Sequence, residues 1–430
     1  MKKVSVRAYS ALLIALAVIV GLCIYVSRFI SDGEDWALYF NAGRAKTTLT
    51  DRNGVVLAER SAAGSLYAED AAVRTACYQL VGDYAGNVGT GALQRFSKQM
   101  LKYDPVFGVA EGKDRTLALT VDSALNTAAY YALGGRKGAV LVSDYTTGEI
   151  LCEFSSPCID PLYPPEELPD GVYLNRCISS SFVPGSIFKL VTAAAAIENI
   201  PDLYERTFYC GGSIDVKGVT VTCTGTHGDQ TIEQALANSC NCAFGQLALE
   251  LGADKLAEYA ESFGITQSHS LDGIDTARGN FDPDVDGSPA LAWSGIGQYN
   301  DLVCPYSMLR IVSAIANGGV LYEPSLLGAA QNGTRLMSAD TAKKLADMMS
   351  YNVAANYGEY NFPGLNIAAK TGTAELGNGE ADHGWFVGFL NDPEHPYAFT
   401  VLVENGGSGL GAAAPVANAV LQTAVKSLQP

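Results

Sequence analysis

The sequence predicts an α+β fold in which helices cover one antiparallel sheet. Strand-like runs occur both early and late in the region after residue 115, at 116–121, 138–145, 150–154, 366–375, 384–390 and 397–403. Helical spacing occupies the stretches between and after them, at 122–133, 186–197, 231–262, 305–317 and 412–428. Strands grouped at both ends of a region, with helices between them, favour this layered architecture over an alternating parallel one.

The N-terminus predicts a membrane anchor. Basic residues precede an apolar run over 9–26 that carries no charge and is about long enough to span a bilayer. A positive flank stays in the cytoplasm, so we expect a cytoplasmic tail at 1–8, an anchor at 9–30 and an extracytoplasmic remainder. A cleaved signal peptide is the alternative. No small-x-small site follows the run, where Val26-Ser27-Arg28-Phe29 stands instead, which favours an uncleaved single-pass anchor in the cell membrane.

Residues 31–115 are expected to form a small α+β spacer domain. Two β-rich runs flank Asn53-Gly54, a strong hairpin signal. The glycine-rich stretch 82–91 predicts a loop, and no group of catalytic residue types occurs in this part. The composition shifts near Asp114-Arg115, so a second domain is expected over 116–430.

Charge and histidine content exclude several functions. The net charge of −17 argues against nucleic acid as a partner, which would need a basic face. The four histidines are scattered, and neither H-E-x-x-H nor C-x-x-C occurs. No catalytic metal and no cofactor is therefore predicted.

Three short motifs carry the candidate chemistry, and they occur in a fixed order along the chain: Ser186-Ile187-Phe188-Lys189, Ser239-Cys240-Asn241 and Lys370-Thr371-Gly372-Thr373. Residues three apart share a helix face, so Ser186 and Lys189 should meet. A serine is a poor nucleophile until a base takes its proton, and a lysine made neutral by burial and by a nearby cation, such as Lys370, could be that base.

The other two motifs suit substrate binding. Ser239 could pass a proton to a leaving amine, and Asn241 could hold a substrate amide. Lys370 and the hydroxyls of the third motif suit a terminal carboxylate, and Gly372 would let a peptide lie along the strand edge. The N–H groups of Ser186 and Thr373 could form an oxyanion hole. Taken singly, the motifs are equally compatible with helix caps and a polar edge strand.

The ordered set resembles class B penicillin-binding proteins, which are monofunctional peptidoglycan D,D-transpeptidases. Further resemblance covers the hairpin after the anchor, the start of the second domain, the stretch between the second and third motifs, and the strand after the third motif: Asp51-Arg52-Asn53-Gly54, Gly135-Arg136-Lys137-Gly138-Ala139-Val140, Gly295-Ile296-Gly297-Gln298 and Gly384-Trp385-Phe386-Val387-Gly388. The resemblance is greatest to short members with a cysteine inside the second motif.

This resemblance implies a penicillin-binding/serine β-lactamase-like transpeptidase fold for 116–430. It implies that Ser186 is the acylated nucleophile, Lys189 its base, and Ser239, Asn241, Lys370, Thr371, Gly372 and Thr373 the rest of the site. The implied substrates are stem peptides ending in D-Ala-D-Ala, β-lactams are implied to acylate the same serine, and a membrane glycosyltransferase is the implied partner.

Two other functions share these motifs. A D,D-carboxypeptidase or β-lactamase would use water as the acceptor, but no E-x-x-L-N pattern stands between Asn241 and Lys370, which disfavours a class A β-lactamase. A β-lactam sensor needs a cytoplasmic output domain, and only about eight residues precede the anchor.

Ten cysteines are present, nine of them beyond the anchor. Cys210 and Cys223 bracket a short stretch that predicts a hairpin, and they form the best candidate disulfide, with two free thiols as the open alternative. Cys240 and Cys242 are too close on one helix to bridge each other.

Overall fold

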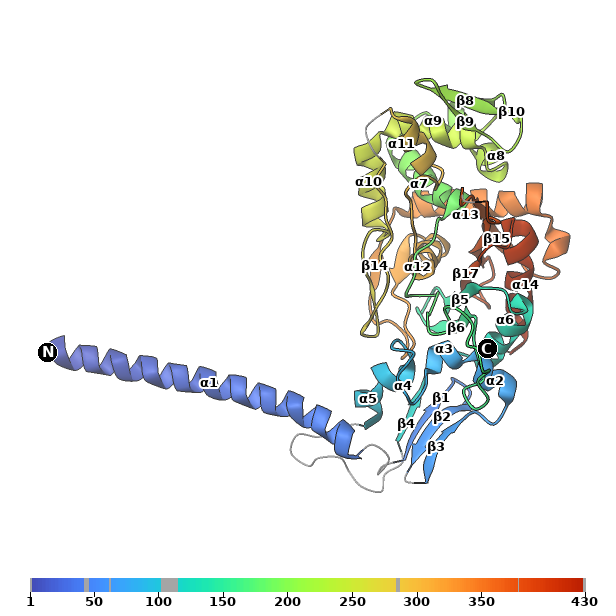
Figure 1. The fold of residues 1–430 in the computed structure, drawn as a ribbon. Helices are drawn as coiled ribbons and strands as arrows, with labels where there is room; N and C mark the ends of the chain where they lie inside the picture. Colours follow the sequence, from blue (N-terminus) through green and yellow to red (C-terminus); the bar gives the residue numbers. More distant parts are fainter. Residues whose placement is uncertain are drawn as a thin grey trace.

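The computed structural model describes residues 2–41, 46–61, 63–101, 115–283, 287–377 and 379–427. Asp114, at the predicted domain boundary, and Leu428, at the end of the last predicted helix, lie outside these ranges. The described chain consists of a long N-terminal helix, a small sheet with short helices, and a large α+β body (Figure 1).

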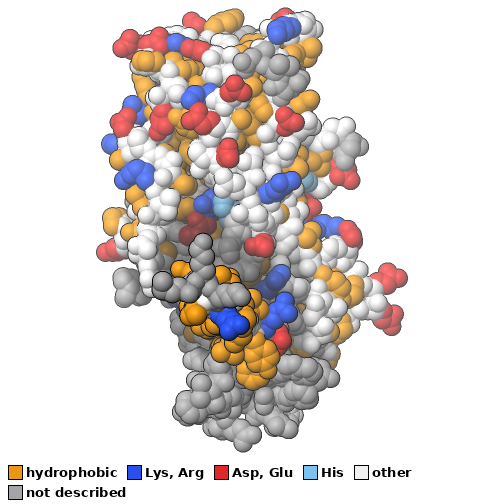
Figure 2. Space-filling model, turned by 90° about the vertical axis from the view of Figure 1, so that its left-hand side faces the viewer, with side chains coloured by type: hydrophobic (Ala, Val, Ile, Leu, Met, Phe, Trp, Pro, Cys, Tyr) orange, Lys and Arg blue, Asp and Glu red, His pale blue; other side chains and the backbone are white. Residues whose placement is uncertain are grey.

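The first helix, α1 (Lys2–Asn41), projects away from the rest of the molecule (Figure 1). Its segment Val6–Gly33 has a mean hydropathy of 2.5, and among the described residues it is the one helix long and apolar enough to cross a membrane. Figure 2, viewed from the side toward which α1 projects, shows hydrophobic side chains gathered on this helix, with charged side chains scattered over the rest of that face. This helix covers the predicted anchor.

A four-stranded sheet follows, in the order β3-β2-β1-β4. Its strands are β1 (Thr47–Thr50), β2 (Val56–Ser61), β3 (Gly64–Tyr67) and β4 (Arg115–Ala118). The predicted hairpin forms between β1 and β2, and the Asp51 Oδ1 atom accepts from the Asn53 and Val55 N–H groups, both at 2.9 Å, to close the turn. The strand β4 pairs in parallel with β1, so the strand predicted at 116–121 belongs to this small sheet and not, as expected, to the antiparallel sheet of the body. The short helices beside this sheet are α2 (Ala71–Ala76), α3 (Tyr78–Val81), α4 (Ala92–Arg95) and α5 (Ser97–Leu101).

The body is built on a five-stranded antiparallel sheet in the order β15-β16-β17-β5-β6, which confirms the predicted fold class. Its strands are β5 (Gly138–Asp144), β6 (Ile150–Ser156), β15 (Ile367–Ala374), β16 (His383–Leu390) and β17 (Tyr397–Val403). Strands from the start and the end of the body are neighbours in this sheet, because β5 pairs with β17, with Val142 opposite Phe399. The strand β15 lies at one edge of the sheet, with a neighbour on one side only.

Helices cover both faces of this sheet. On one face α6 (Ser123–Leu133) packs against α14 (Ala414–Ser427), and on the other face α12 (Pro305–Ala316) packs against the central strands. The helix predicted at 122–133 is α6, and both its ends are capped: the Asp122 carboxylate accepts from the Ala124 N–H, and Gly134 caps the end in the left-handed conformation. The two clusters of buried apolar side chains on these faces form the core.

A helical layer stands above β15 and carries the middle of the chain. It contains α7 (Lys189–Asn199), α8 (Ile232–Ala237), α9 (Asn241–Leu251), α10 (Ala253–Ser262), α11 (Pro289–Ser294) and α13 (Ala339–Asn352). The small strands at its rim are β7 (Phe208–Cys210), β8 (Ser213–Val216), β9 (Val219–Thr222), β10 (Gly228–Gln230), β11 (Ser270–Leu271), β12 (Ile274–Asp275), β13 (Val320–Tyr322) and β14 (Gly333–Arg335). The predicted hairpin between Cys210 and Cys223 is β8–β9.

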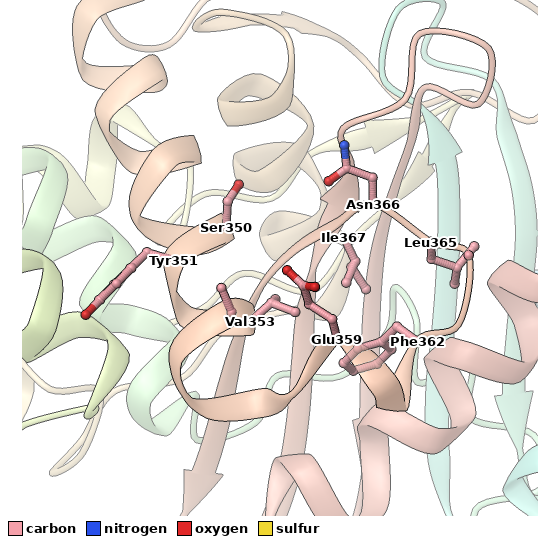
Figure 3. Close-up of a pocket in the computed structure, with 10 residues that line it drawn as sticks. Ser350, Tyr351, Val353, Glu359, Phe362, Leu365, Asn366 and Ile367 are labelled. Carbon is pink, nitrogen blue, oxygen red and sulfur yellow. The ribbon is translucent and has the colours of Figure 1, made fainter.

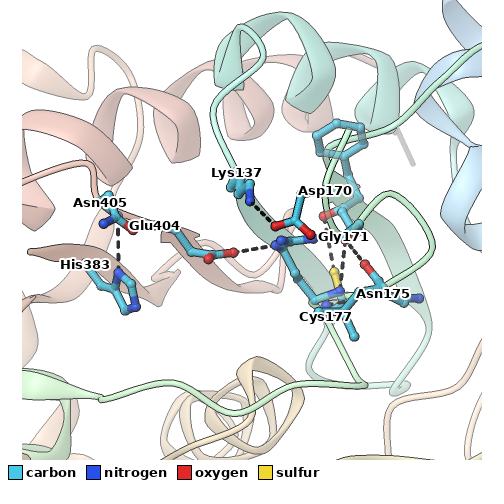
Figure 4. A network of polar contacts seen from close by, with 12 residues as sticks. Lys137, Asp170, Gly171, Asn175, Cys177, His383, Glu404 and Asn405 are labelled. Atoms are coloured by element: carbon cyan, nitrogen blue, oxygen red, sulfur yellow. Dashed lines mark hydrogen bonds and ion pairs between the residues drawn. The ribbon is translucent and has the colours of Figure 1, made fainter. Parts of the chain in front are cut away.

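A long proline-rich loop connects β6 to the Ser186 turn, and polar contacts hold it against the body (Figure 4). Arg176 forms an ion pair with Glu404, just after β17, and Lys137 contacts Asp170 at 3.0 Å. The buried Asn175 amide donates to Glu153 on β6 at 2.6 Å. The segment that leads into the first motif is therefore held at both the sheet and the loop after β17.

Candidate active site

The first motif lies where the proline-rich segment enters the helical layer. Ser186 is in the 3-10 turn η1 (Gly185–Phe188), which continues directly into α7 with Lys189 as its first residue. The Lys189 Nζ atom donates to the Ser186 Oγ atom at 3.0 Å. The two side chains therefore meet, as the three-residue spacing predicts. Ser186 is partly exposed, whereas Lys189 is fully buried.

The second motif forms the turn between α8 and α9. Ser239 has a φ of +51°, in the left-handed region, and Asn241 is the first residue of α9. The turn directs both side chains at Lys189, whose Nζ atom contacts the Ser239 Oγ atom at 3.2 Å and the Asn241 Oδ1 atom at 2.8 Å. The Asn241 amide also donates to the Thr222 carbonyl at 2.9 Å, at the end of β9.

The third motif lies on the edge strand β15. The Lys370 Nζ atom donates to the Ser239 Oγ atom at 3.0 Å and to the Thr371 carbonyl at 2.9 Å. Both lysines thus contact the Ser239 hydroxyl, and that hydroxyl joins all three motifs. Thr373, two residues further along the strand, is exposed.

Gly372 packs against the turn that carries Ser186, a contact that the sequence did not indicate. A Cβ atom added at Gly372 would stand 2.9 Å from the Pro184 carbonyl oxygen and 3.0 Å from the Ile187 Cγ2 atom. Gly185, in the same turn, has a φ of +56° and approaches the Thr373 carbonyl so closely that an added Cβ atom would lie 2.5 Å from it. These two glycines set the distance between the first and third motifs.

Tyr357 completes the edge of β15, and sequence reasoning missed it. Its hydroxyl accepts from the Thr371 N–H and from the Thr371 Oγ1 atom, both at 3.1 Å. Backbone groups two residues apart in a strand point to the same side, so the Thr373 N–H also points to this outer edge. Tyr357 lies in a π-helical turn (Val353–Tyr357) after α13, and no local sequence pattern marks it.

Burial controls the protonation of both lysines. It lowers the pKa of Lys189 to about 7, and the nearby thiols of Cys223, Cys240 and Cys242 raise that pKa in part. Burial also lowers the pKa of Lys370 well below its usual value, and the charge of Lys189 lowers it further. The sequence predicted that the nearby cation Lys370 would help to keep Lys189 neutral. In the structure the charge of Lys189 instead lowers the pKa of Lys370. A buried amine with a pKa of about 7 is partly neutral at neutral pH. At 3.0 Å from a hydroxyl, the neutral amine is able to take that hydroxyl's proton.

The candidate disulfide pair belongs to a larger group. The ten cysteines are free thiols in the structure, and the sulfur atoms of Cys210, Cys223, Cys240 and Cys242 all lie within 4.8 Å of one another. A bond between Cys210 and Cys223 stays a prediction.

A hollow of about 610 Å³ lies beside the start of β15 (Figure 3). It is lined by Ser350, Tyr351, Val353, Ala354, Glu359, Phe362, Gly364, Leu365, Asn366 and Ile367. No residue of the three motifs lines it, so it is separate from the candidate active site.

A hydroxyl, two buried lysines and an edge strand, arranged on an antiparallel sheet covered by helices, agree with the resemblance to penicillin-binding transpeptidases. Residues 138–422 match the family model described as "Penicillin binding protein transpeptidase domain", and the chain belongs to this family. It is 32% identical over 337 residues to the peptidoglycan D,D-transpeptidase PbpA of Mycobacterium tuberculosis, across 68% of each chain. It is also 31% identical to the stage V sporulation protein D of Bacillus subtilis, over 60% of this chain and 44% of that one.

Solved structures give the same result. The D,D-transpeptidase domain of a peptidoglycan glycosyltransferase from Eggerthella lenta superposes with a TM-score of 0.76 at 28% identity, over 90% of this chain and 99% of that one. Penicillin-binding protein A of M. tuberculosis also gives 0.76, at 27% identity, over 89% and 99%. The family resemblance, the fold and the function of a peptidoglycan D,D-transpeptidase are thereby confirmed.

Proposed function

We propose that this transpeptidase works through a serine acyl-enzyme formed on Ser186. One observation supports this more than any other: the Lys189 amine is fully buried, has its pKa lowered to about 7 and contacts the Ser186 hydroxyl at 3.0 Å. In its neutral form Lys189 takes the Ser186 proton, and the Ser186 Oγ atom attacks the carbonyl between the two terminal D-alanines.

The remaining residues act on the substrate. The N–H groups of Ser186 and Thr373 hold the oxyanion, and Lys370 with the third-motif hydroxyls of Thr371 and Thr373 binds the terminal carboxylate. As the C–N bond breaks, Ser239 passes a proton to the leaving D-alanine. The amine of a second stem peptide then attacks the ester, forms the cross-link and restores Ser186.

Asn241 has two roles in this scheme, one before and one after the substrate binds. In the free protein its Oδ1 atom accepts from Lys189 and its amide donates to Thr222. We propose that Asn241 positions Lys189 before substrate binds and turns to the substrate amide afterwards. Gly372 allows β15 to pack closely on the Ser186 turn. The backbone of the substrate peptide pairs with β15 at the next part of the edge, at Thr373.

We also propose that α1 is a single-pass anchor with its N-terminus in the cytoplasm. The basic residues before the apolar segment favour this orientation. Residues 31–115 would then be a spacer that holds the transpeptidase domain (116–430) outside the membrane. A membrane glycosyltransferase is the proposed partner, because cross-linking requires newly polymerised glycan.

Intact mass after incubation with penicillin tests the acyl-enzyme. The unmodified protein should gain the mass of one penicillin, and Ser186→Ala should gain none. Ser262→Ala, at the exposed end of α10, is the matched control and should gain the same mass as the unmodified protein. An adduct on the Ser186→Ala protein would overturn the assignment of the nucleophile.

Protease treatment of spheroplasts tests the orientation separately. Protease added outside should degrade the chain after about Ser31 and leave the anchor protected. A catalytic domain that is protected in intact spheroplasts and degraded after lysis would reverse the proposed orientation.

A further inference from the structure

Four cysteines from three separate segments converge beside the second motif. Cys210 ends β7, Cys223 follows β9, Cys240 caps the N-terminus of α9, and Cys242 lies in the first turn of that helix. Their four sulfur atoms all lie within 4.8 Å of one another, and no other group of this kind occurs among the described histidines, cysteines and carboxylates. Three of the four thiols are buried, and Cys223 is partly exposed.

The sulfur atoms lie close enough together to surround one metal ion. Four thiolates bound to zinc at about 2.3 Å place their sulfur atoms about 3.8 Å apart. The Cys223 and Cys240 sulfur atoms lie 3.9 Å apart. A disulfide joins two sulfurs at about 2.0 Å and gives no reason for two more to gather around the pair.

Backbone N–H groups point at these sulfurs. The Asn241 N–H donates to the Cys223 Sγ atom at 3.2 Å, and the Ala243 N–H donates to the Cys240 Sγ atom at 3.4 Å. Donors of this kind, at the first turn of an 11-residue helix, stabilise thiolates and fix their orientation around a metal. The partly exposed Cys223 gives an ion a way in.

We propose that Cys210, Cys223, Cys240 and Cys242 bind one zinc ion in a closed, tetrahedral, structural site. Tetrahedral sets of four sulfurs select zinc or iron, and a site with four protein ligands leaves no position open for catalysis. Each thiol releases its proton to solvent as its sulfur binds the ion, and no oxidation or reduction takes place. The Cys210–Cys223 disulfide would consume two of the same sulfurs, so the zinc site and that bond exclude each other.

The site would brace the catalytic turn. Cys240 stands between Ser239 and Asn241, and Ser239 holds a left-handed φ of +51°. An ion held by Cys240 and Cys242 from α9, and by Cys210 and Cys223 from the rim strands, would fix this turn from behind. Ser239 and Asn241 would then be held in reach of Lys189 before substrate arrives.

Metal analysis of the full-length protein in detergent tests the proposal. The protein is purified without chelator, incubated with zinc and dialysed; about one zinc per chain is expected. Cys210→Ser and Cys242→Ser should each lose it. Cys304→Ser is the matched control, because Cys304 is also a buried thiol that donates to a backbone carbonyl, of Cys177 at 3.5 Å, and it should keep the zinc.

Two measurements on the unmodified protein keep the proposal testable if a variant fails to fold. Cobalt in place of zinc should give the visible absorption of a tetrahedral cobalt thiolate, and a strong chelator should lower the melting temperature and slow penicillin acylation until zinc is restored. No zinc after dialysis, iron instead of zinc, or a mapped disulfide between any two of the four cysteines would overturn the zinc site. An unchanged acylation rate after zinc removal would overturn its role as a brace. If Ser186 is still acylated, whether fast or slowly, the assignment of Ser186 as the nucleophile stands independently of the zinc site.

Discussion

The Lys370 amine donates to the Ser239 hydroxyl at 3.0 Å and thereby joins two segments that are 131 residues apart in the sequence. The same hydroxyl accepts from Lys189, which also contacts Ser186. Lys189 therefore lies between the two serines, whereas the hydrogen bonds of Lys370 are to Ser239 and to the backbone of its own strand. The two lysines differ in position, and we expect them to differ in function.

Arginine substitutions separate these functions. Lys189→Arg should slow penicillin acylation by about 10²–10⁴-fold, because arginine stays protonated and cannot act as a base. Lys370→Arg keeps a cation for the carboxylate and should slow acylation by only about tenfold. Stopped-flow measurement with a fluorescent penicillin compares the two variants, and equal rates would contradict the assigned roles.

The acylation rate should rise with pH. Burial lowers the pKa of Lys189 to about 7, so the neutral amine that acts as base is scarce below that pH and predominant above it. The rate constant measured between about pH 5 and about pH 9 should increase through pH 7 and then level off. A rate that is constant, or that falls over this range, would show that neutral Lys189 is not the base.

Gly372→Ala should destabilise the protein and slow acylation. The added methyl group would lie 2.9–3.1 Å from Pro184, Ile187 and Trp385, which is too close without a shift of the Ser186 turn. Overpacking of this kind costs about 1–3 kcal/mol in the free energy of unfolding. Thermal melting measures the change, and Gly89→Ala, where an added Cβ atom meets nothing within 4 Å, is the control. Equal melting temperatures for the two variants would contradict the packing argument.

Tyr357→Phe should weaken binding at the third motif. The change removes the acceptor for the Thr371 N–H and hydroxyl, and an unpaired buried donor costs about 1–3 kcal/mol. Because Tyr357 positions β15 without contacting Ser186, the dissociation constant of the initial penicillin complex should rise while the limiting acylation rate stays the same. Tyr360→Phe, at a side chain that is 84% exposed, should change neither quantity. A fall in the limiting rate alone would place Tyr357 in the chemical step.

The sequence predicted the features that depend on neighbours along the chain. The helix at 122–133, the hairpin at Asn53-Gly54 and the meeting of Ser186 with Lys189 all follow from residues within a few positions of one another. The strands of the body were likewise marked by local apolar and β-branched runs.

Features that arise from packing between distant segments were missed. Tyr357 reaches Thr371 only because the turn after α13 packs beside β15, and Gly372 needs to be small only because the Ser186 turn lies against it. The four cysteines are separated by 12, 16 and 1 residues, a spacing that matches no familiar metal pattern. Their convergence requires β7, β9 and α9 to be in place, and the sequence alone suggested a single pair.

The candidate active site lies on an edge strand, and the unpaired backbone groups of an edge strand can pair with a strand of another molecule. Three polar contacts occupy the outward backbone groups of β15: the Asn352 amide on the Ala369 carbonyl, Tyr357 on the Thr371 N–H, and Lys370 on the Thr371 carbonyl. A strand from another molecule would have to displace all three to extend the sheet. This edge is therefore protected from aggregation at Ala369 and Thr371. We expect the substrate peptide of the proposed mechanism to pair beyond them, at Thr373, beside the serine.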